Sequence, residues 1–100
     1  MEESVVREHA QAHADAMVAG DLARAGGDLT PEAQEAAAGV MRELPRPVET
    51  AELVRVEAAG DDGFVSHIRY GGGGKTVTVE ARWADQGGRP RIVGLALGRS

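Results

Sequence analysis

The chain has 100 residues, a formal net charge of −5 and no cysteine. These values predict a single domain without disulfide bonds or cysteine-ligated zinc, and they point to no cofactor. An acidic chain repels phosphate backbones, and no apolar run is long enough to span a membrane, so we expect neither a nucleic-acid nor a membrane partner. Residues 1–9 lack a hydrophobic signal segment, which favours a cytoplasmic protein. Frequent Ala, Arg, Gly and Val without any Asn are typical of a GC-rich bacterial source.

The apolar content of 42% overstates the size of the hydrophobic core, because seventeen residues are alanine and there is only one Phe, one Tyr and one Trp. Alanine buries little area, so the core depends on Val, Leu, Met and the three rings. Small chains with thin cores often obtain the missing burial from a partner chain. The composition therefore predicts a homodimer.

Residues 4–44 read as helical. A stripe at spacings of four, three and four marks one face of a first helix, at Val6, Ala10, His13 and Met17. Gly20 ends this helix, and Asp21 is positioned to cap a short second one, "LARA". Thr30 and Pro31 are typical of the N-cap and first position of a third helix. The expected buried stripe of this third helix comprises Ala33, Ala36, Ala37, Val40, Met41 and Leu44.

Residues 48–97 change to a period of two, which predicts a four-stranded antiparallel meander. The inward residues are expected to be Val54, Val56, Ala58, Phe64, Ser66, Ile68, Tyr70, Val77, Val79, Ala81 and Trp83. Asp61 and Asp62 are expected to form a tight turn. On the outer face we expect Arg69 and Glu80 to pair across neighbouring strands. The fold class is therefore α+β, with helices covering the dry face of the sheet.

The stretch "RYGGGGKTVTVEARW", residues 69–83, resembles the end of a phosphate-binding loop because glycines precede Lys75 and Thr76. Such a loop begins with a glycine six residues before its lysine, and that position is Arg69. A helix must also follow the lysine, so that its N-terminus meets the phosphate. Here the residues after Thr76 alternate as a strand, so the glycines are interpreted as a hairpin loop.

His9 and His13 lie four residues apart on one helix face, which is the spacing of paired zinc ligands. Glu8 precedes the pair instead of following its first histidine, so the motif of zinc hydrolases is absent and no metal site is predicted. His13 interrupts an apolar stripe, and a polar group aimed at a core needs a hydrogen-bond partner. It is either a core histidine bonded to a strand residue or a polar group that lines a pocket.

The order helix, short helix, helix and curved antiparallel sheet resembles the nuclear-transport-factor-2-like superfamily, which includes ketosteroid isomerases and polyketide cyclases. The stretch "VREHAQAHADAMVAGDLARA" is similar to the family's opening helix, which runs into a break here formed by residues 19–22. The resemblance implies a trimmed, cystatin-like cone whose open end admits ligands. It also implies that His13, eight residues before Asp21, occupies the place of an oxyanion-binding tyrosine and donates a hydrogen bond. The segment "GGDLTPEAQEAA" runs straight into the third helix, so no counterpart of the family's acidic base is expected there.

Two functions follow from these observations. The first is a small non-catalytic domain that homodimerises through its sheet, as the thin core and the missing acidic base indicate. The alternative is a domain that binds a small hydrophobic ligand in the cone. Isomerase, lyase or hydrolase activity is an extension of this alternative. The residues expected to line that pocket are His13, Met17, Tyr70 and Trp83.

Overall fold

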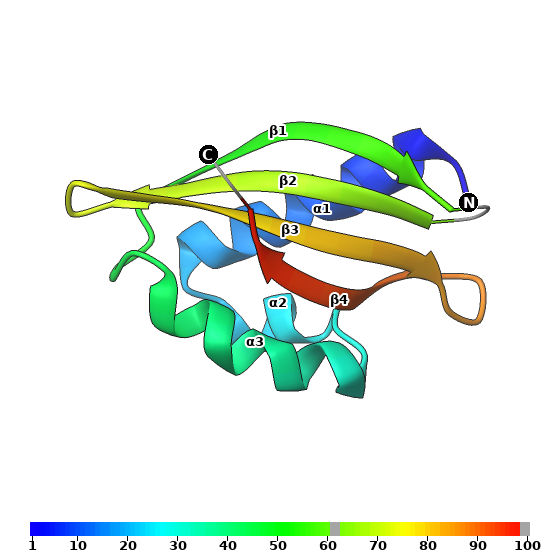
Figure 1. The fold of residues 1–100 in the computed structure, drawn as a ribbon, viewed down its shortest axis with the longest axis horizontal. Helices are drawn as coiled ribbons and strands as arrows, with labels where there is room; N and C mark the ends of the chain where they lie inside the picture. Colours follow the sequence, from blue (N-terminus) through cyan, green and yellow to red (C-terminus); the bar gives the residue numbers. More distant parts are fainter. Residues whose placement is uncertain (61–62, 99–100) are drawn as a thin grey trace.

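A computed structural model describes residues 1–60 and 63–98 of the chain. The described residues form three helices followed by four strands, in the order α1 (Glu3–Ala19), α2 (Leu22–Gly26), α3 (Pro31–Glu43), β1 (Thr50–Ala59), β2 (Gly63–Gly72), β3 (Lys75–Asp85) and β4 (Pro90–Leu97) (Figure 1). The α+β fold class is confirmed. Within the described residues, no helix has the length and apolarity needed to cross a membrane.

Short-range signals in the sequence account for most of the helix ends. Gly20 ends α1 in the left-handed region, with φ of 75°. The Asp21 side chain accepts a hydrogen bond from the backbone N–H of Arg24 at the start of α2. The Thr30 hydroxyl does the same for Ala33 at the start of α3. Each cap satisfies a backbone donor that the first helical turn leaves without a partner.

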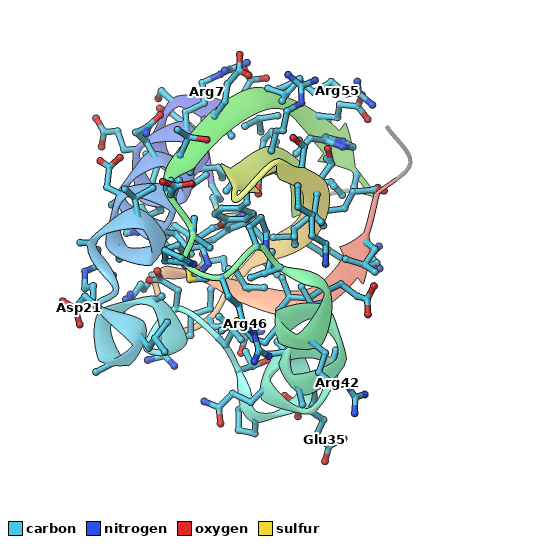
Figure 2. The ribbon with its side chains drawn as sticks, turned by 90° about the vertical axis from the view of Figure 1, so that its left-hand side faces the viewer. Arg7, Asp21, Glu35, Arg42, Arg46 and Arg55 are labelled. Carbon is cyan, nitrogen blue, oxygen red and sulfur yellow. The ribbon has the colours of Figure 1, made fainter. Side chains whose placement is uncertain are left out.

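The four strands pair in sequence order, β1-β2-β3-β4, and every neighbouring pair is antiparallel. Seen along the strands, the sheet forms an open arc with the helices on its inner side, while charged side chains such as Arg55 and Glu35 point away from the interior (Figure 2). The predicted inward face of β2 and β3 is confirmed by the burial of Ser66, Ile68, Tyr70, Val79, Ala81 and Trp83. The turn expected at residues 61–62 lies outside the described residues.

The prediction for β1 holds for Val56, which is buried, but not for Val54 or Ala58, which are both exposed; Ala58 lies on the inner face, near the end of the strand. Leu53 pairs with Ile68 on the inner face, but Arg55 is the next residue to find a partner, so Val54 occupies a β-bulge. An extra residue in one strand moves the side chains of the residues before it to the opposite face from the one that strict alternation predicts. Val54 is therefore exposed, and Leu53 takes the inward position that was expected for Val54. On α3, Ala36 is likewise exposed rather than buried.

The expected pair between Arg69 and Glu80 is also wrong. The Arg69 guanidinium donates to the carboxylate of Glu52 at 3.0 Å, across the β1–β2 pair. Register explains the choice, because Arg69 lies directly opposite Glu52, whereas Glu80 lies opposite His67. Directly opposed residues are the nearest cross-strand neighbours in an antiparallel sheet.

The glycine run forms the β2–β3 hairpin, as the sequence predicts. Gly73 and Gly74 have positive φ values of 57° and 80°, which other residues rarely adopt. Gly72 leaves room for the Pro47 carbonyl oxygen, with which any side-chain Cβ would overlap. The backbone N–H of Gly73 donates to the Glu49 side chain at 2.9 Å. These glycines therefore serve a tight turn that packs against the segment before β1, and no helix follows them.

The buried residues form two adjoining clusters between the helices and the sheet. One cluster lies around Met17, Ile68 and Tyr70, and the other around Val6, Trp83 and Ile92. Trp83 is fully buried, and its indole N–H donates to the Ser66 hydroxyl at 3.0 Å. The first cluster is incompletely filled, and a cavity lies beside it.

Candidate functional site

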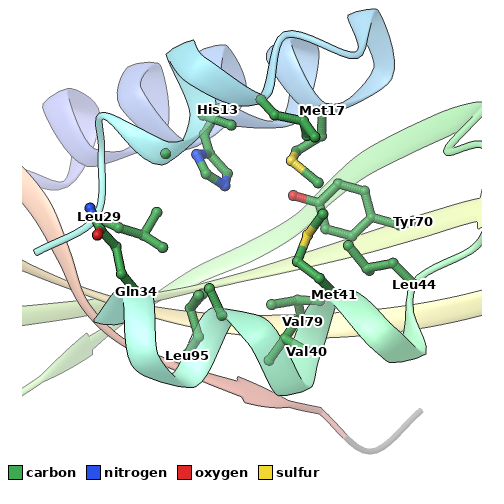
Figure 3. Close-up of a pocket in the computed structure, with 14 residues that line it drawn as sticks. His13, Met17, Leu29, Gln34, Val40, Met41, Leu44, Tyr70, Val79 and Leu95 are labelled. Atoms are coloured by element: carbon green, nitrogen blue, oxygen red, sulfur yellow. The ribbon is translucent and has the colours of Figure 1, made fainter. Parts of the chain in front are cut away.

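A cavity of about 220 Å³ lies between the three helices and the inner face of the sheet. Its walls are mostly apolar and include Met17, Ala25, Leu29, Val40, Met41 and Leu95 (Figure 3). Leu22 and Gln34 also line it, and both are exposed, so the cavity opens to the surface between α2 and α3. The space exists because small side chains, Ala25, Gly26 and Ala37, stand where larger ones would fill the core.

Three polar side chains interrupt this apolar lining, those of His13, Gln34 and Tyr70. Among the described residues, no Asp, Glu, Lys or Arg lines the cavity. Figure 3 shows the His13 ring extending from α1 into the space and the Tyr70 hydroxyl reaching toward α1 from the sheet. Apolar walls with a few placed polar groups are the usual composition of small-molecule sites.

His13 is held by a buried carboxylate. Its Nδ1 lies 3.0 Å from Oδ2 of Asp28, which is 0% exposed, while His13 is 7% exposed. A carboxylate only accepts hydrogen bonds, so Nδ1 carries the hydrogen and the neutral ring has its free lone pair on Nε2. Nε2 makes no hydrogen bond with any described side chain or backbone group.

Two arginines contact the same carboxylate from the solvent side. Nη1 of Arg24, on α2, lies 3.2 Å from Oδ1 of Asp28, and Nη2 of Arg89 lies 3.1 Å from that atom. Both guanidinium side chains are 45% exposed. Arg89 is 61 residues from Asp28 in sequence and comes from the turn before β4. The Asp28 carboxylate thus contacts side chains from α1, from α2 and from the turn before β4 at one buried point.

Backbone hydrogen bonds hold Asp28 in this position. The Ile92 N–H donates to the Asp28 carbonyl at 2.7 Å, and the Thr30 N–H donates to the Ile92 carbonyl at 2.9 Å. These two bonds attach the loop between α2 and α3 to the edge of β4, where Leu29 forms a parallel bridge with Ile92. The carboxylate therefore belongs to an ordered part of the core and not to a free loop.

Burial and partners act in opposite directions on Asp28. Burial raises the pKa of its carboxyl, but the hydrogen bond and charge of His13, with those of Arg24, outweigh burial. The pKa therefore lies below its ordinary value of 3.8, and the group is ionised near neutral pH. For Tyr70, burial raises the pKa well above its ordinary value of 10.0, so that its hydroxyl stays protonated.

The structure brings together three of the four residues expected to form the pocket. His13, Met17 and Tyr70 line the cavity, whereas Trp83 lies outside the lining. The Trp83 ring packs edge-on against the His13 ring with centroids 6.3 Å apart, so it supports the histidine from within the core. The His9 ring lies tilted beside the Trp83 ring, with centroids 6.4 Å apart. Among the described residues, no group of three or more His, Cys, Asp or Glu side chains is placed to hold a metal ion.

Asp28 was not expected to take part in the site. The segment "GGDLTPEAQEAA" was expected to hold no counterpart of an acidic base, and His13 was expected to bond to a strand residue if it lay in the core. Instead the acid at position 28 binds His13 from the loop after α2. The sequence held one signal for this role: Asp28 follows two glycines and precedes the apolar Leu29. An acidic residue after glycines is equally typical of a turn, so this signal alone does not indicate a buried partner.

Comparisons of the chain with protein-family models, with curated proteins and with solved structures found no match. The function is therefore argued from the geometry of the cavity and its polar groups.

Proposed function

We propose that the chain binds a small hydrophobic molecule in the cavity beside His13. The observation that carries this proposal is an apolar space of about 220 Å³ with a histidine held at its wall by a fully buried aspartate. A polar group aimed at an apolar interior has a desolvation cost unless it meets a partner. A ligand with one polar group supplies that partner and fills the apolar space at the same time.

The volume sets the size of the ligand. An apolar cavity of about 150 Å³ accommodates benzene, so a space of this size suits roughly ten non-hydrogen atoms. The opening between Leu22 and Gln34 gives such a molecule a route into the site. Naphthalene has the right size and no polar group, which makes it a suitable probe of the apolar space alone.

Replacing Ala37 with phenylalanine is expected to weaken naphthalene binding by at least about tenfold, because a phenyl ring then occupies much of the cavity. Ala36→Phe is the matched control, since Ala36 is the exposed neighbour on the same helix and does not line the space. Ligand-observed NMR titration measures both dissociation constants. Equal affinities for the two variants, or no naphthalene binding by the unmodified chain, would refute the proposal.

Isomerase, lyase or hydrolase activity stays a prediction from the sequence. The pair of His13 and Asp28 supports it, because each of these reactions needs a group that accepts or donates a proton. A buried carboxylate bonded to Nδ1 orients the imidazole and fixes which ring nitrogen carries the hydrogen. The likeness to the nuclear-transport-factor-2-like superfamily also stays a prediction.

Homodimerisation through the sheet is the second candidate function, and one observation favours it. Nε2 of His67, on the outer face, is buried but has no hydrogen-bond partner among the described residues; Oε2 of Glu57 lies 3.6 Å away. A partner surface could supply the missing bond. Sedimentation velocity checks this prediction: a dimer is expected to dissociate on dilution, whereas a 10.4 kDa particle at every concentration would contradict it.

A further inference from the structure

The hydrogen-bonding state of His13 restricts what can bind beside it. Nδ1 uses its hydrogen on the carboxylate of Asp28, at 3.0 Å. In the neutral ring, Nε2 is then an acceptor without a hydrogen, and it has no partner among the described residues. The complementary group on a ligand is a donor. This differs from the donor role that the resemblance implies for position 13.

The second polar group deep in the cavity is the Tyr70 hydroxyl. Tyr70 is 3% exposed, and it lines the same cavity as His13. Because burial raises the pKa of Tyr70, its hydroxyl remains protonated, and it is available both to donate and to accept. His13 and Tyr70 come from opposite walls, α1 and β2, and both reach into the same space (Figure 3).

The charges near the site disfavour an ionised ligand. No described Arg or Lys side chain lines the cavity. Arg24 and Arg89 direct their guanidinium groups at Asp28 and do not line the cavity, so they are not placed to pair with a ligand there. An anion in this apolar space would lose its hydration without gaining a permanent counter-charge.

We propose that the ligand is an uncharged hydrophobic molecule of roughly ten non-hydrogen atoms whose hydroxyl group donates a hydrogen bond to Nε2 of His13. This inference rests on the proposed function and adds the chemical class of the ligand. Aromatic or terpene-like alcohols and phenols of that size belong to this class. A ketone or an ether has only an acceptor to offer, and a carboxylate carries a charge.

A matched ligand series tests the class without any mutation. The four probes are naphthalene, 2-methoxynaphthalene, 2-naphthol and 2-naphthoate, titrated near neutral pH by ligand-observed NMR. We expect 2-naphthol to bind about tenfold tighter than 2-methoxynaphthalene, which has the oxygen but not the donor. We expect 2-naphthoate to bind more weakly than 2-naphthol by at least about the same factor.

Two variants test whether the preference for 2-naphthol depends on His13. His13→Leu removes the acceptor, so the preference for 2-naphthol over 2-methoxynaphthalene is expected to fall close to one while naphthalene still binds. Ala36→Phe, at an exposed position outside the cavity, is the control and is expected to retain the preference. If His13→Leu does not fold, the ¹⁵N chemical shift of Nε2 in the unmodified chain replaces it: this shift is expected to change when 2-naphthol is added and not when naphthalene is added.

The outcomes separate the two proposals. If none of the four probes binds, the proposed function fails and this inference fails with it. If naphthalene binds, but 2-naphthoate binds as tightly as 2-naphthol, or 2-methoxynaphthalene does, the cavity is a ligand site and the hydroxyl class is wrong. An Nε2 that carries a hydrogen near neutral pH in the free protein would also overturn the inference.

Discussion

Asp28→Ala is expected to lower the free energy of unfolding by roughly 2–4 kcal/mol, because it removes the shared partner of three positively charged or polar side chains. The carboxylate is fully buried and contacts His13, Arg24 and Arg89. His13 is itself buried, so it would be left with an unpaired N–H in the core. The loss of stability is limited because both arginines are half exposed and can turn toward water. Urea denaturation followed by circular dichroism measures the change.

The matched control is Asp15→Ala, on the exposed face of α1, where the carboxylate contacts only the Gln11 amide among the described residues. This change is expected to alter the stability by less than about 0.5 kcal/mol. A loss for Asp28→Ala as small as that of the control would contradict a structural role for the buried network. A large loss for both variants would indicate a nonspecific effect of removing negative charge.

The pH dependence supplies an independent check of the same carboxylate. Its pKa is lower in the folded chain than the ordinary value of 3.8 expected for the unfolded chain. The ionised group therefore stabilises the fold above that value, and this contribution is lost as the pH falls below it through the folded pKa. The stability difference between the unmodified chain and Asp28→Asn should shrink on acidification in that range. A difference that persists unchanged in strong acid would be inconsistent with the lowered pKa.

Trp83→Ala is expected to destabilise the fold by about 4 kcal/mol, which is a large part of the 5–15 kcal/mol typical of a small domain. Trp83 is fully buried at the centre of the second cluster, and its ring supports His13. The chain has no other tryptophan, and alanine-rich neighbours cannot expand to fill the space. Thermal denaturation followed by far-ultraviolet circular dichroism is expected to show a lowered midpoint or a partly unfolded chain.

Two further substitutions distinguish lost volume from a lost hydrogen bond. Ser66→Ala leaves the indole N–H of Trp83 without its acceptor and is expected to cost about 1–3 kcal/mol. Leu97→Ala is the control, since Leu97 is an apolar residue of β4 that is 45% exposed. A Trp83→Ala variant as stable as Leu97→Ala would show that the ring is not central to the core.

Most of the fold could be predicted from the sequence because its signals are local. The stripe through Val6 and Met17 follows from helical period, and the ends of α2 and α3 follow from capping by Asp21 and Thr30. The alternation that places Trp83 inward follows from the pleat of a strand. Each of these depends on residues only a few positions apart, so the chain order alone is sufficient to reveal them.

The candidate site depended on tertiary structure. His13 and Asp28 are 15 residues apart and meet only because the loop after α2 is attached to β4. Arg89 reaches the same carboxylate from 61 residues away. The bulge at Val54 shifts a register that the sequence pattern alone places differently. The cavity is the space that α1, α2, α3 and the sheet together leave unfilled. Distances between remote segments and unfilled volume are properties of the packed assembly, so the pattern of neighbouring residues does not encode them.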